Sequence, residues 1–127
     1  MTNSILLLTH GTVGEAMLQA ASNTIGNRPE NLLSLSVNVN PNPALIFSKL
    51  ETIIAQQNGK SLLILTDLFG ATPCNLATKL SQKDKVAIIS GVNLGMLLRS
   101  INYIHLPLKE LANKAHEGGK DCIKTCE

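Results

Sequence analysis

Apolar residues follow two alternating patterns along this chain. Short runs of large aliphatic side chains, such as residues 5–8, are typical of strands buried inside a sheet. The longer stretches between them begin or end with helix signals, such as Thr72-Pro73 and Asn58-Gly59. The pattern predicts strands at residues 5–9, 32–39, 61–66 and 86–90, and helices at residues 13–25, 43–57, 72–80, 94–101 and 108–116.

This regular alternation predicts an α/β fold, with a doubly wound, mostly parallel sheet of four strands and helices on both faces. Residues 32–39 alternate between apolar and polar side chains, as expected for an outer strand. Gly118-Gly119 is expected to stop the last helix, and residues 122–126 could add a short C-terminal edge strand. We expect residues 1–127 to form a single domain.

Composition narrows the classes of protein that fit. The net charge is +2 and the basic residues are not clustered, so the sequence shows no basic stretch of the kind that binds nucleic acid. The longest apolar runs are too short to cross a bilayer, and no signal peptide is visible, so we expect a cytoplasmic protein without membrane insertion. An odd number of cysteines favours reduced thiols over a disulfide framework.

The residues whose side chains could take part in catalysis lie where predicted strands end. His10 follows the first strand and precedes a helix, and Asp67 follows the third strand. A third loop, Gly91-Val92-Asn93, follows the fourth strand. Because ligands bind at the carboxyl ends of strands in open α/β sheets, we expect these loops to converge there.

An acid beside an imidazole predicts a nucleophilic histidine. If Asp67 accepts a hydrogen bond from one ring N–H of His10, it fixes the tautomer and orients the ring. The other ring nitrogen keeps its lone pair and is able to attack phosphorus. Helix-start backbone groups and one hydroxyl would then bind the phosphoryl oxygens; the predicted phosphoryl-binding residues are Gly11, Thr12, Gly70, Ala71 and Thr72. The chemistry calls for no cofactor and no metal ion.

Three ordered motifs resemble those of a known family. They are Thr9-His10-Gly11, the stretch at residues 67–75 (Asp-Leu-Phe-Gly-Ala-Thr-Pro-Cys-Asn), and residues 91–97 (Gly-Val-Asn-Leu-Gly-Met-Leu). Together they resemble the mannose-family enzyme IIA domain of the bacterial phosphoenolpyruvate-dependent sugar phosphotransferase system. The resemblance spans nearly the whole chain.

This resemblance implies a phosphotransferase component in which His10 accepts a phosphoryl group from the phosphocarrier HPr and passes it to an enzyme IIB component. It implies that Asp67 partners the ring, that Thr72 lies near the phosphate, and that Cys74, at a position that is often apolar in the family, serves packing. It also implies a homodimer that exchanges the final edge strand, and association with a membrane permease through IIB. The surface on which partners dock is expected to include Val13, Phe69, Asn93 and Met96.

Other functions fit the same architecture. A flavodoxin-like FMN binder would place a phosphate loop rich in Ser and Thr after the first strand, whereas this chain has a histidine there and only 2% aromatic residues. A response-regulator receiver would need clustered acids at the end of the first strand, where this chain has none. A non-catalytic interaction module stays open, as does a regulatory phosphocarrier without a cognate sugar permease.

Overall fold

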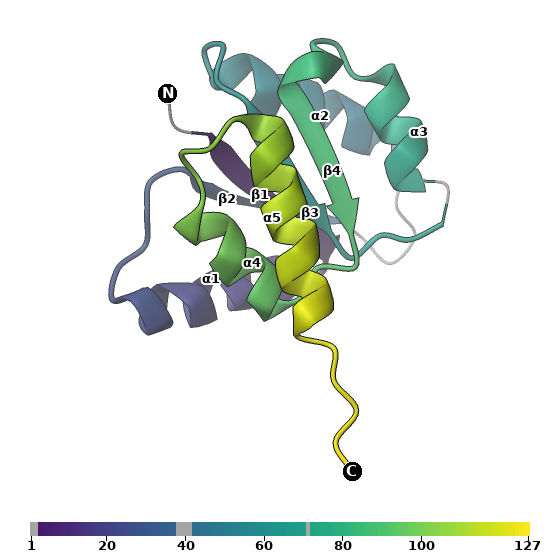
Figure 1. Ribbon diagram of the computed structural model, residues 1–127. Coiled ribbons are helices and arrows are strands. Elements are labelled where there is room, and N and C mark those ends of the chain that lie inside the picture. The colour runs from purple at the N-terminus through teal and green to yellow at the C-terminus, as the bar shows by residue number, and fades with distance from the viewer. Residues whose placement is uncertain (1–2, 38–41, 71) are drawn as a thin grey trace.

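A computed structural model of the chain describes residues 3–37, 42–70 and 72–127. It contains one parallel sheet with the strand order β2-β1-β3-β4 (Figure 1). The bounds of the strands are β1 Ser4–His10, β2 Leu32–Val37, β3 Leu62–Thr66 and β4 Val86–Ser90. The predicted fold class is confirmed, and so is the outer position of the alternating strand, β2.

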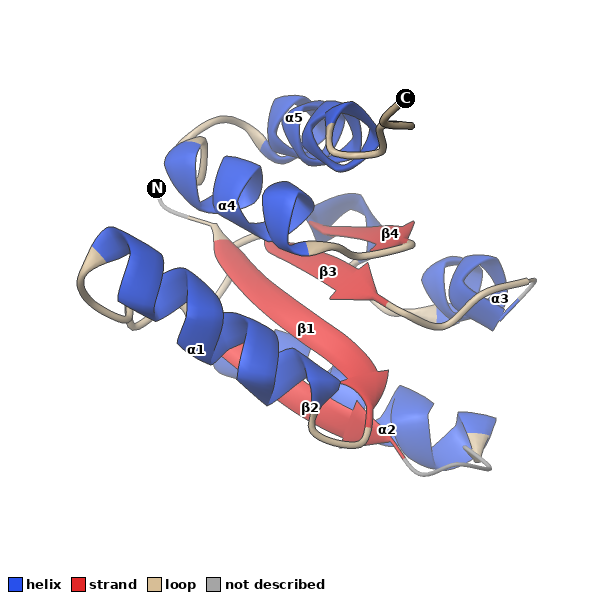
Figure 2. Cartoon of the chain, turned by 90° about the horizontal axis from the view of Figure 1, so that it is seen from below, coloured by secondary structure: helices blue, strands red, loops and turns tan. Residues whose placement is uncertain are grey.

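In the described residues, helices α1, α2 and α3 and the short 3-10 helix η1 lie between the strands, and α4 and α5 follow β4; their bounds are α1 Val13–Ile25, α2 Pro43–Gln56, α3 Thr72–Lys79, η1 Lys83–Lys85, α4 Leu94–Asn102 and α5 Leu108–Asp121. Helices α1, α4 and α5 cover one face of the sheet, and α2 and α3 cover the other (Figure 2). All the predicted elements up to α4 are present, and their ends agree with the prediction to within one residue wherever the structure describes them. Residues 38 and 39 of the predicted second strand lie outside the described residues.

The central strands β1 and β3 are buried because helices cover both of their faces. Side chains that alternate along β1 enter two separate cores: Ile5 and Leu7 pack under α1, α4 and α5, and Leu6 and Leu8 pack under α2 and α3. In the parallel register, Leu8 lies between Leu35 of β2 and Thr66 of β3. The ends of β1 and β3 are therefore held together by the most buried part of the molecule.

The expectation that Gly118-Gly119 stops the last helix was wrong. Both glycines are buried within α5, and a Cβ atom added to Gly118 would lie 2.6 Å from the Cβ of Arg99 on α4. A Cβ atom added to Gly119 would lie 2.6 Å from the Cε of Met96. These glycines allow α5 to approach α4 closely, and this helix packing outweighs the low helix propensity of glycine.

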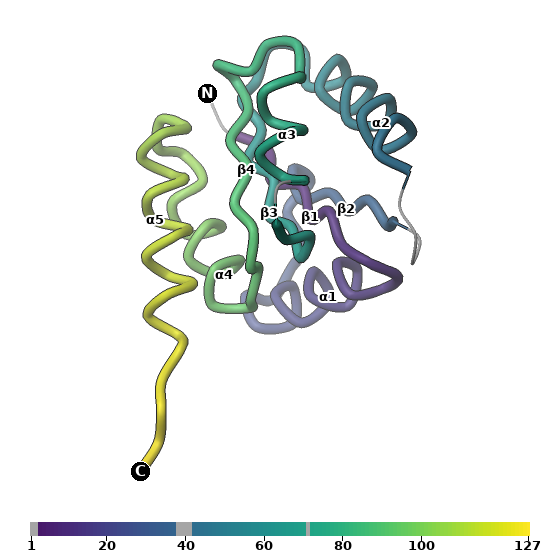
Figure 3. Tube along the Cα trace, turned by 90° about the vertical axis from the view of Figure 1, so that its right-hand side faces the viewer, coloured from purple at the N-terminus to yellow at the C-terminus, as the bar shows by residue number. Residues whose placement is uncertain are grey.

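Residues 122–127 form no strand within this single chain, which does not test the expected edge strand because that strand was predicted to pair with a second subunit. They leave the end of α5 and project away from the sheet (Figure 3). Ile123 is 77% exposed. Exchange of this segment between two subunits stays a prediction.

Other expectations concern the cysteines and the membrane. Cys74 is exposed, so the expectation that it serves packing was wrong; Cys122 and Cys126 are also exposed free thiols.

Across the described residues, no helix combines the length and the apolar character needed to span a bilayer.

Candidate active site

His10 is the last residue of the central strand β1 and lies at the carboxyl edge of the sheet. Its backbone is fixed by pairing with Val37 of β2, whereas 40% of its side chain is accessible to solvent. A histidine held in this way has a rigid main chain and a ring that a partner molecule is able to reach. The position agrees with the general location of ligand sites in open α/β sheets.

Asp67, the first residue after β3, contacts His10 through both the ring and the main chain. The Oδ1 atom of Asp67 lies 3.2 Å from the Nδ1 atom of His10. The backbone N–H of His10 donates to the same carboxylate, with distances of 3.1 Å to Oδ1 and 3.2 Å to Oδ2. The structure thus brings together the two residues that the sequence predicts as partners, and it directs Nδ1, rather than Nε2, toward the acid.

Two buried threonines, each directly before one of these residues, hold the loops in place. Thr9 is 1% exposed, and its Oγ1 atom accepts a hydrogen bond from the backbone N–H of Gly14 at 2.7 Å. Thr66 is fully buried and bonds to the backbone on both sides of the site. Sequence reasoning missed both residues. The available signal was a threonine directly after each of the two apolar runs, residues 5–8 and 62–65, at a place where a buried hydroxyl needs partners.

The first turn of α1 is tied to β1 by close packing at Gly14. A Cβ atom on Gly14 would lie 2.8 Å from the Oγ1 of Thr9, so only glycine fits without displacement. The N-cap residue of α1, Thr12, makes no side-chain cap, and the Thr9 hydroxyl satisfies the Gly14 amide in its place. Gly11 was expected to bind phosphoryl oxygens, but its backbone N–H already donates to the carbonyl of Val37 at 3.1 Å. The exposed residue Thr12 stays a candidate.

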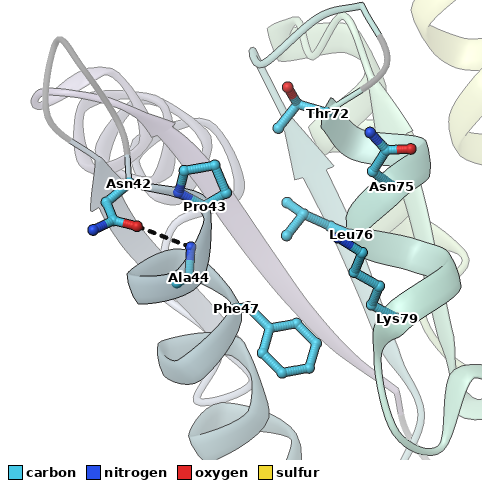
Figure 4. Close-up of a pocket in the computed structure, with 8 residues that line it drawn as sticks. All are labelled: Asn42, Pro43, Ala44, Phe47, Thr72, Asn75, Leu76 and Lys79. Carbon is cyan, nitrogen blue, oxygen red and sulfur yellow. Dashed lines mark hydrogen bonds between the residues drawn. The ribbon is translucent and has the colours of Figure 1, made fainter.

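The loop from β3 to α3 contains the other predicted phosphoryl-binding residues. Gly70 is exposed and has a positive φ of 78°, Ala71 lies outside the described residues, and Thr72 is half-buried at the first position of α3. Thr72 also lines a pocket of about 640 Å³ between α2 and α3. Figure 4 shows Asn42, Pro43 and Phe47 of the α2 side facing Thr72, Asn75 and Leu76 of α3 across this pocket. Within the described residues, Thr72 has no hydrogen bond to His10 or Asp67.

The four residues expected to line a docking surface fall into two groups. Phe69 is 83% exposed and Val13 is 46% exposed, so both offer apolar surface beside the ends of β3 and β1. Met96, however, is buried in the core at 3% exposure, and its assignment to a docking surface was wrong. The side chain of Asn93 caps α4 by accepting from the Met96 N–H and also donates to the carbonyl of Gly119, so its polar atoms serve the fold.

The structure offers few ligands for a metal ion near this site. Within the part of the chain that it describes, no group of three or more His, Cys, Asp and Glu side chains is arranged to hold a metal ion.

Comparison with known proteins identifies the family of this chain. The family model EIIA-man, described as "PTS system fructose IIA component", matches residues 4–116. The chain belongs to the EIIA-man family. Membership makes it a IIA component of the sugar phosphotransferase system and implies a phosphocarrier role. The matched range includes His10, Asp67 and all the loops that converge at their end of the sheet.

Curated relatives agree with this family. The mannose-specific EIIAB component of the phosphotransferase system of Escherichia coli (strain K12) is 29% identical over 103 residues, which are 80% of this chain and 32% of that protein. The chain therefore spans about a third of the length of the curated relatives it matches. The corresponding component of Shigella flexneri matches with the same identity and coverage.

Solved structures show the same fold. The mannose/sorbose-specific IIA subunit from Enterococcus faecalis has a TM-score of 0.84 and 23% identity, with 100% of this chain and 96% of that chain covered. A phosphotransferase component EIIA from Streptococcus agalactiae has a TM-score of 0.81 and 22% identity, with coverage of 96% and 95%. At these identities the likeness establishes the architecture alone.

Proposed function

We propose that this EIIA-man protein is a phosphohistidine carrier in which His10 accepts a phosphoryl group from phospho-HPr and passes it to an enzyme IIB component. The observation that carries the proposal is the contact of Asp67 with both the Nδ1 atom and the main-chain N–H of His10. This contact orients a ring whose side chain is still 40% exposed. A carrier must meet two partners in succession, so it needs a ring that is both oriented and accessible.

We assign different tasks to the two ring nitrogens. Asp67 accepts a hydrogen bond from the N–H at Nδ1, which leaves the lone pair of the neutral ring on Nε2. In the forward step, the Nε2–P bond forms as the N–P bond of the donor's phosphohistidine breaks, and the electron pair of that bond returns to the donor ring. The ring of phosphorylated His10 carries positive charge, which the nearby carboxylate stabilises. Transfer to IIB repeats the exchange with His10 as the leaving group.

Binding of the phosphoryl oxygens is proposed to fall to groups beside the ring. The exposed N-terminal turn of α1 offers amides without helical partners, since the first N–H groups of any helix lack them. Thr12, Gly70, Ala71 and Thr72 are the residues that we assign to this task. Gly11 is left out because its N–H is bonded to Val37.

Val13 and Phe69 are proposed as the apolar part of one surface that HPr and IIB use in turn. Both partners must bring a reacting group to the same nitrogen, so they compete for this surface. Exposed aromatic residues are enriched at interfaces, and Phe69 is the most exposed large apolar side chain among the described residues. The proposal places the chain in the cytoplasm, in contact with a membrane permease only through IIB.

Transfer of radiolabel from phospho-HPr tests the proposal. We expect acid-labile, alkali-stable labelling of the wild-type chain and none of His10→Ala. The matched control is His116→Ala, because His116 is an exposed histidine on α5 and should leave labelling unchanged. Undiminished labelling of His10→Ala would overturn the assignment. Subsequent loss of label to IIB is the expected second step, whereas label that no IIB accepts would favour the regulatory phosphocarrier.

A further inference from the structure

Thr66 is a polar residue in the most buried part of the sheet. It is the last residue of β3, is fully buried, and lies opposite Leu8 in the parallel register. A threonine in such a place needs hydrogen-bond partners, because burial of an unpaired hydroxyl is unfavourable. The partners that it has are all backbone groups of the segments that converge at the site.

The hydroxyl of Thr66 bonds on both sides of the His10–Asp67 pair. It donates to the carbonyl of Leu8 at 2.6 Å, two residues before His10. It accepts from the backbone N–H of Leu68 at 3.0 Å, the residue directly after Asp67. A hydroxyl has one donor and two acceptor positions, so both bonds form at once. The bond to Leu68 closes a turn around Asp67, as Thr side chains do when they bond to the backbone two residues ahead.

The carbonyl group of Thr66 attaches the third loop to the same point. It accepts hydrogen bonds from the backbone N–H of Gly91 at 2.9 Å and of Val92 at 3.2 Å. One residue thus connects the ends of β1, β3 and β4. The side-chain hydrogen bonds of Thr66 join the two segments that carry His10 and Asp67, and they require a hydroxyl. The bonds to its main-chain carbonyl would form with any residue type at this position.

We infer that Thr66 is a positioning residue for phosphoryl transfer: its hydroxyl turns the Asp67 carboxylate onto Nδ1 of His10. Without the hydroxyl, the N–H of Leu68 in the loop after β3 loses its acceptor and the side-chain bond to the Leu8 carbonyl is lost, while the strand itself keeps its pairing. The carboxylate then no longer has one defined place, and the imidazole loses the contact that selects its tautomer. Thr66 touches neither the ring nor the phosphoryl group, so it acts through Asp67. The inference rests on the proposed function only where it concerns transfer rates.

The test compares Thr66→Val, which is close in volume and lacks the hydroxyl, with Thr66→Ser, which retains it. We expect Thr66→Val to slow transfer from phospho-HPr by about 10- to 100-fold, the range for a small misplacement of a reacting group. Thr66→Ser should restore the rate. The matched control is Thr52→Val on α2, because the Thr52 hydroxyl is exposed and bonds only to Ser48 of its own helix.

Two further measurements separate positioning from a purely structural role. The ¹⁵N signals of the His10 ring should show the proton on Nδ1 in the wild type and a mixture of tautomers in Thr66→Val. In an Asp67→Asn background, Thr66→Val should have less than about twofold effect on the rate, because coupled residues are not additive. A wild-type tautomer in Thr66→Val would overturn the inference. So would a Thr66→Val substitution that lowers the transfer rate by the same factor in the wild-type and Asp67→Asn backgrounds.

Thr66→Ala serves as a second variant that introduces no larger group, and it is expected to behave like Thr66→Val. If both variants fail to fold, Thr66 is required for folding and the positioning role is overturned. The tautomer measurement needs no phosphoryl donor. A wild-type chain that is not phosphorylated would therefore overturn the proposed function alone, while the ring signals would still decide the role of Thr66.

Discussion

The end of the sheet that carries His10 and the C-terminal segment of the chain are held in opposite ways. At the sheet end, hydrogen bonds between loops hold His10, Asp67 and Thr66 within one chain. The C-terminal segment, residues 122–127, is exposed throughout. Beyond Ile123, its residues make no hydrogen bond with any described residue.

This difference indicates which properties a single chain possesses and which need a partner. The orientation of His10 is complete in one chain. The C-terminal segment has an exposed apolar residue, Ile123, and unpaired backbone, while β4 leaves one edge of the sheet unpaired in the described chain. Unpaired strand edges readily accept another strand. We therefore keep the prediction that two copies of the chain exchange this segment.

The first prediction concerns the end of the sheet that carries His10, the region whose geometry is complete in one chain, and it has the largest expected effect. Asp67→Asn should keep the fold but slow transfer to His10 by about 10²- to 10⁴-fold, as for orienting acids at other imidazole sites. The cause is loss of the charge that fixes the tautomer and stabilises the phosphorylated ring. Rapid-quench transfer from phospho-HPr measures the rate, and Asp84→Asn, an exposed acid in η1, is the control. An unchanged rate would reduce Asp67 to a structural role.

The second prediction concerns the region that needs a partner. Deletion of residues 123–127 leaves α5 intact, since the helix ends at Asp121. We expect the dimer dissociation constant to rise by about 100-fold, which corresponds to about 2.8 kcal/mol, or a few strand hydrogen bonds. Sedimentation velocity over a range of concentrations measures it. If the full-length chain is already a monomer at micromolar concentration, the exchanged segment is not a dimer contact.

The two regions also differ in how far the sequence predicted them. The His10–Asp67 contact follows from local patterns, because His10 ends one apolar strand, Asp67 directly follows another, and the carboxyl ends of parallel strands lie at one edge of the sheet. Gly118-Gly119 looked like a helix stop because local propensity is all that a single sequence displays. In the structure, α4 lies against these glycines, and that contact between distant residues decides the conformation. Met96 was misplaced for the same reason: it sits three residues after a helix cap, on the face that α5 covers.

The third prediction tests where partners dock at the end of the sheet that carries His10. Phe69→Ala should slow transfer from phospho-HPr by about tenfold, the effect of losing an interface contact worth about 1.4 kcal/mol. Its free energy of unfolding should change by less than about 1 kcal/mol, because the side chain is 83% exposed and its removal opens no core cavity. Leu45→Ala on α2, where the side chain is 50% exposed, is the control for loss of exposed apolar surface. Large loss of stability with normal kinetics would place the docking surface elsewhere.

The fourth prediction has the smallest effect and separates stability from transfer. Glu15 in the first turn of α1 bonds to Arg28 and to Ser34 of β2, and the hydrogen bond with Arg28, followed by that with Ser34, lowers the pKa of the Glu15 carboxyl below its ordinary value of 4.5. A lowered folded-state pKa contributes stability that is fully present above the ordinary value and is lost as the pH falls through the folded-state value.

Glu15→Gln should therefore slightly lower the melting temperature at pH 7 and flatten its decline below about pH 4.5. Thermal unfolding followed by circular dichroism between pH 7 and pH 3 checks this. The rate of transfer to His10 at pH 7 should stay at the wild-type value. A slower transfer would mean that the loops at the end of the sheet depend on this surface contact.

The most direct test of the central claim is the identity of the phosphorylated atom. NMR of the ¹⁵N-labelled phosphoprotein distinguishes a phosphoryl group on Nε2 from one on Nδ1 of His10. The account predicts phosphorylation at Nε2, with the proton retained on Nδ1 beside Asp67. A phosphoryl group on Nδ1, or on any residue other than His10, would contradict it.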